Sequence, residues 1–217
     1  MPRLAVTRIL AWGDSLTEGS VEPSRSVGAL TAGLPEGYPF KLQVLMAQRY
    51  TEQTVTVLNG GLGGMWAKED RDRYKQAVNA EKPELVLLWH GANDMLGLKG
   101  ASESDIDKGI AEAYAAMEDF AGYAIDRGIK VMIATQTPVI EGLRRGVAFS
   151  YLPRYNTRLR DLAAHLRVPL VDLFTLVPAS LVGQDGLHLT EAGYARVAEV
   201  FLQAIETTYE VTAPAAR

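Results

Sequence analysis

Five short apolar runs, spread along the whole chain, are the feature that most restricts what this sequence can fold into. Each run is rich in valine, isoleucine or leucine and shows little of the polar alternation expected of a half-exposed strand. Runs of this kind are typical of strands buried on both faces, as in a parallel sheet. They span residues 8–12, 54–58, 85–89, 130–135 and 168–173.

Segments with helical spacing lie between these runs. The longest repeats apolar side chains from Ile106 to Ala124, with Ser102 and Asp105 as a capping signal and Gly128 at its end. Further helices are expected from Pro39 through Met46, from Tyr155 through Leu166, and through Ile205 with Thr190 as the N-cap. Strands that alternate with helices indicate βαβ units, so we predict an α/β fold with a parallel sheet.

The size and charge of the chain set further limits. Its 217 residues suit one domain, which we place over residues 1–217 with a frayed tail at residues 211–217. A formal net charge of −4 gives no electrostatic reason to expect a nucleic-acid partner. No heptad pattern demands a partner chain, so we expect a monomer or a small homo-oligomer.

The absence of cysteine excludes disulfides, thiolate catalysis and thiolate-bound metals. Apolar runs such as residues 85–89 are too short to cross a bilayer, so membrane insertion is not expected. The first residues lack the apolar stretch of a signal peptide, which makes a cytoplasmic location the default expectation. A secreted chain that had been trimmed would look the same, so secretion stays open as an alternative.

Polar and glycine-rich motifs follow the expected strands. Ligands of parallel α/β folds bind outside the carboxyl ends of the strands, so chemistry is expected there. Together the motifs supply a serine, exposed backbone N–H groups, an amide and an aspartate–histidine pair. They are Gly13–Gly19 with Ser15, Asn59–Gly64 with four glycines in five positions, Gly91–Asp94 with Asn93, and Asp185–His188.

Acyl transfer needs this set of groups. Ser15 requires a base to take its proton, and the imidazole of His188 suits that task. Asp185 lies three residues before His188, so the carboxylate reaches the ring at little cost in loop closure and can orient it. The backbone N–H groups of Ser15 and Gly64 and the side-chain amide of Asn93 are candidate donors to the oxyanion of the tetrahedral intermediate.

The four motifs, in this order, resemble those of the SGNH/GDSL hydrolase family over most of the chain. The sequence Gly13-Asp14-Ser15-Leu16 is similar to the family's namesake block. The resemblance implies a flavodoxin-like three-layer α/β/α sandwich with a five-stranded parallel sheet in the order 2-1-3-4-5. It also implies metal-free ester hydrolysis by Ser15, Asp185 and His188, with Gly64 as an oxyanion donor and Gly61 or Gly63 as alternatives.

Other interpretations of these residues are weaker. The glycine block satisfies neither the G-x-G-x-x-G nor the Walker pattern, and no histidine–carboxylate spacing beyond Asp185 and His188 suits a metal, so we predict no cofactor and no metal. Asp14 and Asp94 are interpreted as carboxylates that tie down their own turns. His165 is expected on a helix surface, and the Arg144-Arg145 pair is expected to be solvated.

Two long irregular segments, residues 20–37 and 137–153, leave the ligand edge of the predicted sheet and are expected to wall the substrate pocket. Their apolar residues favour an acyl or aryl group as part of the substrate, although about half of these side chains are expected only to cover the core. The candidate pocket residues are Trp66, His90, Val139, Leu143 and Phe149.

We therefore predict a serine esterase that hydrolyses carboxylic esters of small to medium acyl or aryl groups through an acyl-enzyme intermediate. A carbohydrate O-acetyl esterase, a thioesterase or a lysophospholipase would use the same three residues and stay open as alternatives. An alternative from another class is a non-catalytic flavodoxin-like binding domain, although a binder has no need of an aligned serine, histidine and aspartate.

Overall fold

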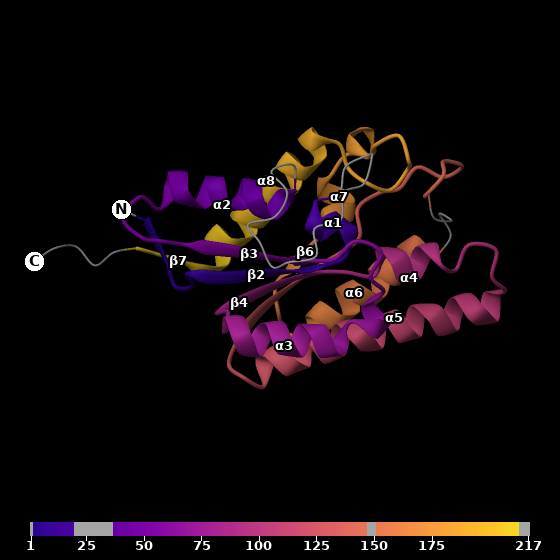
Figure 1. Ribbon diagram of the computed structural model, residues 1–217, viewed down its shortest axis with the longest axis horizontal. Coiled ribbons are helices and arrows are strands. Elements are labelled where there is room, and N and C mark those ends of the chain that lie inside the picture. The colour runs from indigo at the N-terminus through magenta and orange to yellow at the C-terminus, as the bar shows by residue number, and fades with distance from the viewer. Residues whose placement is uncertain (1, 20–36, 147–150, 213–217) are drawn as a thin grey trace, which may run out of the picture.

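A five-stranded parallel sheet forms the centre of the molecule (Figure 1). The computed structural model describes residues 2–19, 37–146 and 151–212. The sheet has the spatial order β3-β2-β4-β5-β6, which is 2-1-3-4-5 when its strands are counted along the chain, and the predicted order is confirmed. Its strands are β2 (Arg8–Gly13), β3 (Thr56–Gly61), β4 (Leu85–Trp89), β5 (Lys130–Ala134) and β6 (Leu170–Val171).

Helices cover both faces of the sheet, which gives the predicted three layers (Figure 1). Helices α2 (Tyr38–Arg49) and α8 (Glu191–Tyr209) lie on one face, and α3 (Arg71–Glu81), α5 (Glu103–Ile125) and α6 (Leu152–Leu166) lie on the other. Short helical turns follow the strands: α1 (Ser15–Glu18), η1 (Ala67–Glu69), α4 (Ala92–Leu96), α7 (Leu173–Leu176) and η2 (Ala179–Leu181). None of the helices described is long and apolar enough to cross a membrane.

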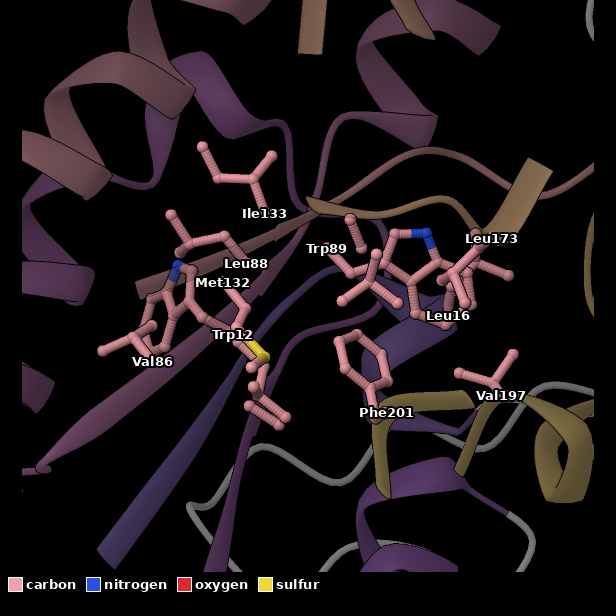
Figure 2. Close-up of a cluster of buried hydrophobic side chains, with 14 of the residues drawn as sticks. Trp12, Leu16, Val86, Leu88, Trp89, Met132, Ile133, Leu173, Val197 and Phe201 are labelled. Carbon is pink, nitrogen blue, oxygen red and sulfur yellow. The ribbon is translucent and has the colours of Figure 1, made fainter. Parts of the chain in front are cut away.

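Two tryptophans at the ends of adjacent strands show how the core is divided between the two faces. Trp12 packs against Tyr74 of α3 with ring centroids 5.2 Å apart, and Trp89 packs against Tyr38 of α2 at 5.6 Å. Both tryptophans are completely buried. Figure 2 shows them among neighbouring apolar side chains, including Phe201. Strands buried on both faces explain the continuous apolar runs in the sequence.

The register of the sheet aligns the ends of three strands. Gly13 at the end of β2 pairs with Gly61 of β3 on one side and with Trp89 of β4 on the other. Residues that follow these three strands therefore emerge at one level of the same sheet edge. This alignment places the serine, glycine and asparagine motifs next to one another.

The two N-caps predicted from the sequence, Ser102 and Thr190, are present in the structure. The Ser102 hydroxyl accepts the N–H of Asp105 at 3.2 Å, and the Thr190 hydroxyl accepts the N–H of Gly193 at 3.1 Å, so both predicted caps are confirmed. Helix α3 was not expected. It buries only Tyr74, Ala77 and Val78, which is too narrow an apolar face to stand out in the sequence.

Two boundaries differ from the sequence expectation. Strand β6 contains only Leu170 and Val171, because helix α7 begins at Leu173. The tail was expected to be frayed from residue 211, but Val211 and Thr212 belong to β7 (Glu210–Thr212), which pairs antiparallel with β1 (Pro2–Leu4). The carboxylate of Glu210 accepts the hydroxyl of Tyr50 at 2.9 Å, which anchors the start of β7.

Candidate active site

Ser15, His188 and Asp185 form one hydrogen-bonded series at the carboxyl edge of the sheet. The Ser15 hydroxyl oxygen lies 2.8 Å from Nε2 of His188, and Nδ1 of His188 lies 2.6 Å from a carboxylate oxygen of Asp185. The three residues are 4%, 2% and 5% exposed in that order, so little water competes for these bonds. With a hydrogen on Nδ1 donated to Asp185, the lone pair of Nε2 faces the serine.

The turn between Asp185 and His188 shapes the carboxylate end of this series. One carboxylate oxygen of Asp185 accepts the N–H groups of Leu187 at 3.0 Å and His188 at 2.9 Å. Gly186 takes a φ of +87°, a conformation that side-chain-bearing residues rarely adopt. Burial by itself would raise the pKa of Asp185, but these N–H groups and the imidazole outweigh it and hold that pKa below its ordinary value.

The segment after β5 packs on this turn. The N–H of Arg145 donates to the carbonyl of Asp185 at 2.7 Å, and the N–H of Ile140 donates to the carbonyl of Gly186 at 2.9 Å. The Arg145 guanidinium lies 3.7 Å from the Asp185 carboxylate. Arg145 was expected to be solvated, and its ion pair with Asp185 corrects that expectation. The sequence carries no signal for this pair, because the partners meet only through the tertiary fold.

Ser15 stands at the first position of helix α1, where its backbone N–H has no acceptor among the described residues. Asp14 caps this helix by accepting the N–H of Leu16 at 3.0 Å, which confirms its expected role in its own turn. Its other carboxylate oxygen accepts the N–H of Ala92 at 3.0 Å. Asp14 therefore joins the turn that carries Ser15 to the turn that carries Asn93.

Asn93 and the glycine motif lie on either side of Ser15. The Asn93 side-chain amide donates to the carbonyl of Met65 at 3.0 Å, which leaves its second amide hydrogen for another acceptor. The N–H of Gly61 is engaged by the Asn59 side chain at 2.9 Å, so Gly61 is excluded as an oxyanion donor. Among the described residues, the N–H groups of Gly63 and Gly64 have no acceptor, and Gly64 is exposed with a φ of +78°.

Not all of the glycines in this motif serve a ligand. A Cβ on Gly61 would lie 2.0 Å from the backbone nitrogen of Glu18, so glycine at this position allows α1 to pack against β3.

The carboxylate of Asp94 was expected to tie down its own turn, and the structure corrects that expectation. Its carboxylate accepts the N–H of Ala67 at 2.7 Å, so it joins the neighbouring segment rather than its own turn.

A narrow apolar crevice adjoins the hydrogen-bonded series. Val139 lines this crevice, as expected of a pocket residue. Three other lining residues are chain neighbours of Ser15, Asn93 and His188. Its lining residues are Leu16, Ala92, Met95, Gln136, Thr137, Val139, Leu152 and Leu187.

The other candidate pocket residues do not line this crevice. His90 was expected to wall the pocket, but it is completely buried and stacks on Phe120 with centroids 5.9 Å apart. Leu143 is 36% exposed and lies beside Gly186, and Trp66 is half-buried with its ring edge against Gly97. Phe149 lies outside the described residues, as do residues 20–36 of the first expected wall.

The parallel sheet and the site at its carboxyl edge place the chain among α/β enzymes. Residues 11–196 match the GDSL-like lipase/acylhydrolase family, and the chain belongs to this family. It is 27% identical over 210 residues to an acetylxylan esterase of Geobacillus stearothermophilus, with 91% of this chain and 93% of that protein covered. It is 25% identical over 202 residues to an arylesterase of Vibrio mimicus, with 92% and 88% covered.

Solved structures share the fold. A lipase/acylhydrolase from Enterococcus faecalis superimposes with a TM-score of 0.76 at 21% identity, with 96% of this chain and 100% of that chain covered. The structure of the Geobacillus acetylxylan esterase gives a TM-score of 0.71 at 23% identity, with 93% and 94% covered. The family and its named esterases identify this chain as a carboxylic ester hydrolase.

Proposed function

We propose that this enzyme hydrolyses carboxylic esters of small to medium acyl or aryl groups through an acyl-enzyme intermediate on Ser15. The observation that carries this proposal is the unbroken series from the Ser15 hydroxyl to Nε2 of His188 at 2.8 Å and from Nδ1 to Asp185 at 2.6 Å. In the related acetylxylan esterase, replacing a serine or a histidine by alanine gives proteins described as catalytic mutants. Those two residue types agree with the roles proposed here for Ser15 and His188.

The first half-reaction follows from the direction of these hydrogen bonds. The Ser15 oxygen attacks the ester carbonyl carbon while Nε2 of His188 takes the hydroxyl proton. Asp185 holds the Nδ1 hydrogen and stabilises the imidazolium that forms. The imidazolium then gives its proton to the leaving alcohol oxygen as the carbon–oxygen bond breaks, which leaves the acyl group on Ser15.

The second half-reaction repeats the same steps with water. Nε2 of His188 takes a proton from the water molecule that attacks the acyl carbon, and Ser15 leaves with that proton. In both tetrahedral intermediates the negative oxygen faces the N–H groups of Ser15 and Gly64 and the second amide hydrogen of Asn93. Preorganised donors of this kind are effective because they need no reorientation as the charge develops.

The substrate class rests on the surroundings of Ser15. The side chains beside it are mainly apolar, such as Leu16, Val139 and Leu187, and the crevice between them is too narrow for a water molecule, so they offer an acyl group an apolar surface rather than a deep pocket. The name of the acetylxylan esterase favours a small acyl group, and the name of the arylesterase favours an aryl ester. A carbohydrate O-acetyl esterase is the second candidate, because the acetylxylan esterase matches 91% of this chain.

The test is the release of p-nitrophenol from esters of increasing acyl length, with wild type and Ser15→Ala side by side and a chelator present. We expect serine-dependent hydrolysis with an optimum among the shorter esters. Hydrolysis that survives in Ser15→Ala would contradict the mechanism. Acetylated xylo-oligosaccharides compared with phenyl acetate separate the two candidates, since a sugar esterase prefers the oligosaccharide in kcat/KM.

A further inference from the structure

A second series, made of two carboxylates on either side of an imidazole, lies behind the active site, away from solvent. Nε2 of His90 donates to a carboxylate oxygen of Asp70 at 3.1 Å. Nδ1 of the same ring lies 3.6 Å from a carboxylate oxygen of Asp14. All three residues are 0% exposed, so none of them contacts the surface. The ester hydrolysis described above uses neither His90 nor Asp70.

Arg73 anchors the far end of this series. Its guanidinium makes two hydrogen bonds of 2.6 Å to the two carboxylate oxygens of Asp70, and it donates at 2.8 Å to the carbonyl of Gly60 in β3. It lies 3.8 Å from the ring centroid of Trp12. A bidentate pair of this kind compensates the buried charge of Asp70 and fixes its orientation.

Asp14, at the other end of the series, binds the two turns that carry the oxyanion donors of Ser15 and Asn93. Nδ1 of His90 lies 2.9 Å from the N–H of Gly91, which it accepts when the ring is neutral. A protonated ring would no longer accept this N–H, and its positive charge would instead attract the Asp14 carboxylate 3.6 Å away. Asp14 in turn accepts the N–H groups of Leu16 and Ala92, each at 3.0 Å. These backbone groups are immediate neighbours of Ser15 and Asn93.

We propose that His90 and Asp70 are positioning residues that fix the donors of Ser15 and Asn93 relative to each other. The proposal rests on the serine mechanism proposed above. An oxyanion site must hold its donors to within about 0.5 Å of the productive geometry, and fully bonded buried networks supply such rigidity. Apolar packing would fill the same space without the cost of burying charges. His90 and Asp70 touch no substrate and act through the carboxylate of Asp14.

The experiment compares His90→Asn and Asp70→Asn with two matched controls. His165→Asn replaces an exposed histidine. Asp172→Asn weakens another aspartate–arginine pair, with Arg160 at 3.0 Å, which lies at the end of β6, two strands away from β4. For each protein, kcat and KM for a p-nitrophenyl ester are measured well below the unfolding temperature. The inhibition constant of phenylboronic acid, which forms a tetrahedral adduct on serine, is measured in parallel.

We expect kcat to fall by about 10- to 100-fold in His90→Asn and Asp70→Asn, with KM within about twofold of wild type. The inhibition constant of the boronic acid should rise in proportion, because the same donors hold its tetrahedral adduct. The kcat of the double variant should be little lower than that of either single variant, since both changes break the same series. The two controls should keep the kcat of wild type.

Wild-type kcat and boronic acid affinity in the folded His90 and Asp70 variants would overturn the proposal, even if the melting temperature falls. Should His90→Asn fail to fold, Arg73→Lys replaces it, because Arg73 lies partly at the surface and lysine keeps the charge while losing the two-point contact. Unchanged kcat in Arg73→Lys would then overturn the proposal. Failure of the proposed function gives a different result, in which wild type itself shows no Ser15-dependent hydrolysis.

Discussion

The hydroxyl oxygen of Ser15 and Nε2 of His188 lie 2.8 Å apart, although 173 positions separate the two residues in the chain. Ser15 reaches this position from the end of β2, and His188 reaches it from the turn before α8. Their contact depends on α8 packing against the sheet through residues such as Phe201 (Figure 2). The packing of the core therefore brings Ser15 and His188 together.

Replacement of either member of this pair should abolish turnover. Because the residues act as a unit, Ser15→Ala and His188→Ala should each lower kcat by up to ~10⁶, and the double variant should be no worse. Steady-state kinetics with a p-nitrophenyl ester measure this, and circular dichroism checks the fold. His165→Ala is the matched control and should keep wild-type activity. Additive losses in the double variant would show that the two residues act separately.

Any acid limb of kcat/KM between about pH 8 and 5 should not include the ionisation of Asp185. The pKa of Asp185 is held below its ordinary value, so this carboxylate stays ionised across that range. The acid limb of kcat/KM against pH should therefore report a single proton. A limb of two protons would mean that Asp185 also titrates.

Asp185→Asn should lower kcat by about 10⁴, since the amide no longer fixes the Nδ1 hydrogen of His188. The carboxylate also accepts two backbone N–H groups, so the melting temperature should fall as well. Asp172→Asn, at the end of β6, is the control for loss of a carboxylate at the same sheet edge. A kcat near that of wild type in Asp185→Asn would exclude the aspartate from the proposed mechanism.

Asn93→Ala should lower kcat by about 10²–10³ while KM changes little, because the amide is aimed at a charge that exists only in the intermediate. Asn79→Ala is a suitable control, since Asn79 is exposed and its side chain accepts the hydroxyl of Tyr123 at 3.0 Å. A large rise in KM at constant kcat would instead assign Asn93 to ground-state binding.

The stability of the fold should depend on the ionisation of His90. Burial by itself would lower the pKa of His90, but the carboxylates of Asp14 and Asp70 outweigh burial and raise this pKa from 6.5 to about 9. The folded state then binds a proton more tightly than the unfolded state. The resulting stabilisation is complete below pH 6.5 and is lost as the pH rises through about 9.

Urea unfolding at pH 6.5 and at pH 9 tests this dependence. The free energy of unfolding of wild type should decrease more over that interval than the free energy of His90→Asn. Equal decreases in the two proteins would mean that His90 does not take up a proton on folding. His165→Asn serves as the control for a histidine that faces solvent.

Much of the fold could be predicted from the sequence for a clear physical reason. Parallel strands are buried on both faces, so each leaves a continuous apolar run, and residues 85–89 match β4 in full. The chemistry follows strand ends, so Ser15 and Asn93 were predicted to lie at one sheet edge. Asp185 and His188 are close in sequence, and a short turn is enough to join their side chains.

Only the tertiary structure decided which groups are available and which are already bonded. The N–H of Gly61 is taken by Asn59, which no glycine pattern reveals. His90 and Asp70 are 20 positions apart in the chain. They meet because Asp70 stands at the N-terminal end of helix α3, which packs on the sheet although its apolar face is narrow. Local patterns record the burial and spacing of neighbouring residues, whereas such bonds depend on how separate elements pack together. The sequence by itself therefore determined the sheet and the reactive residues, and packing determined the network that holds them in place.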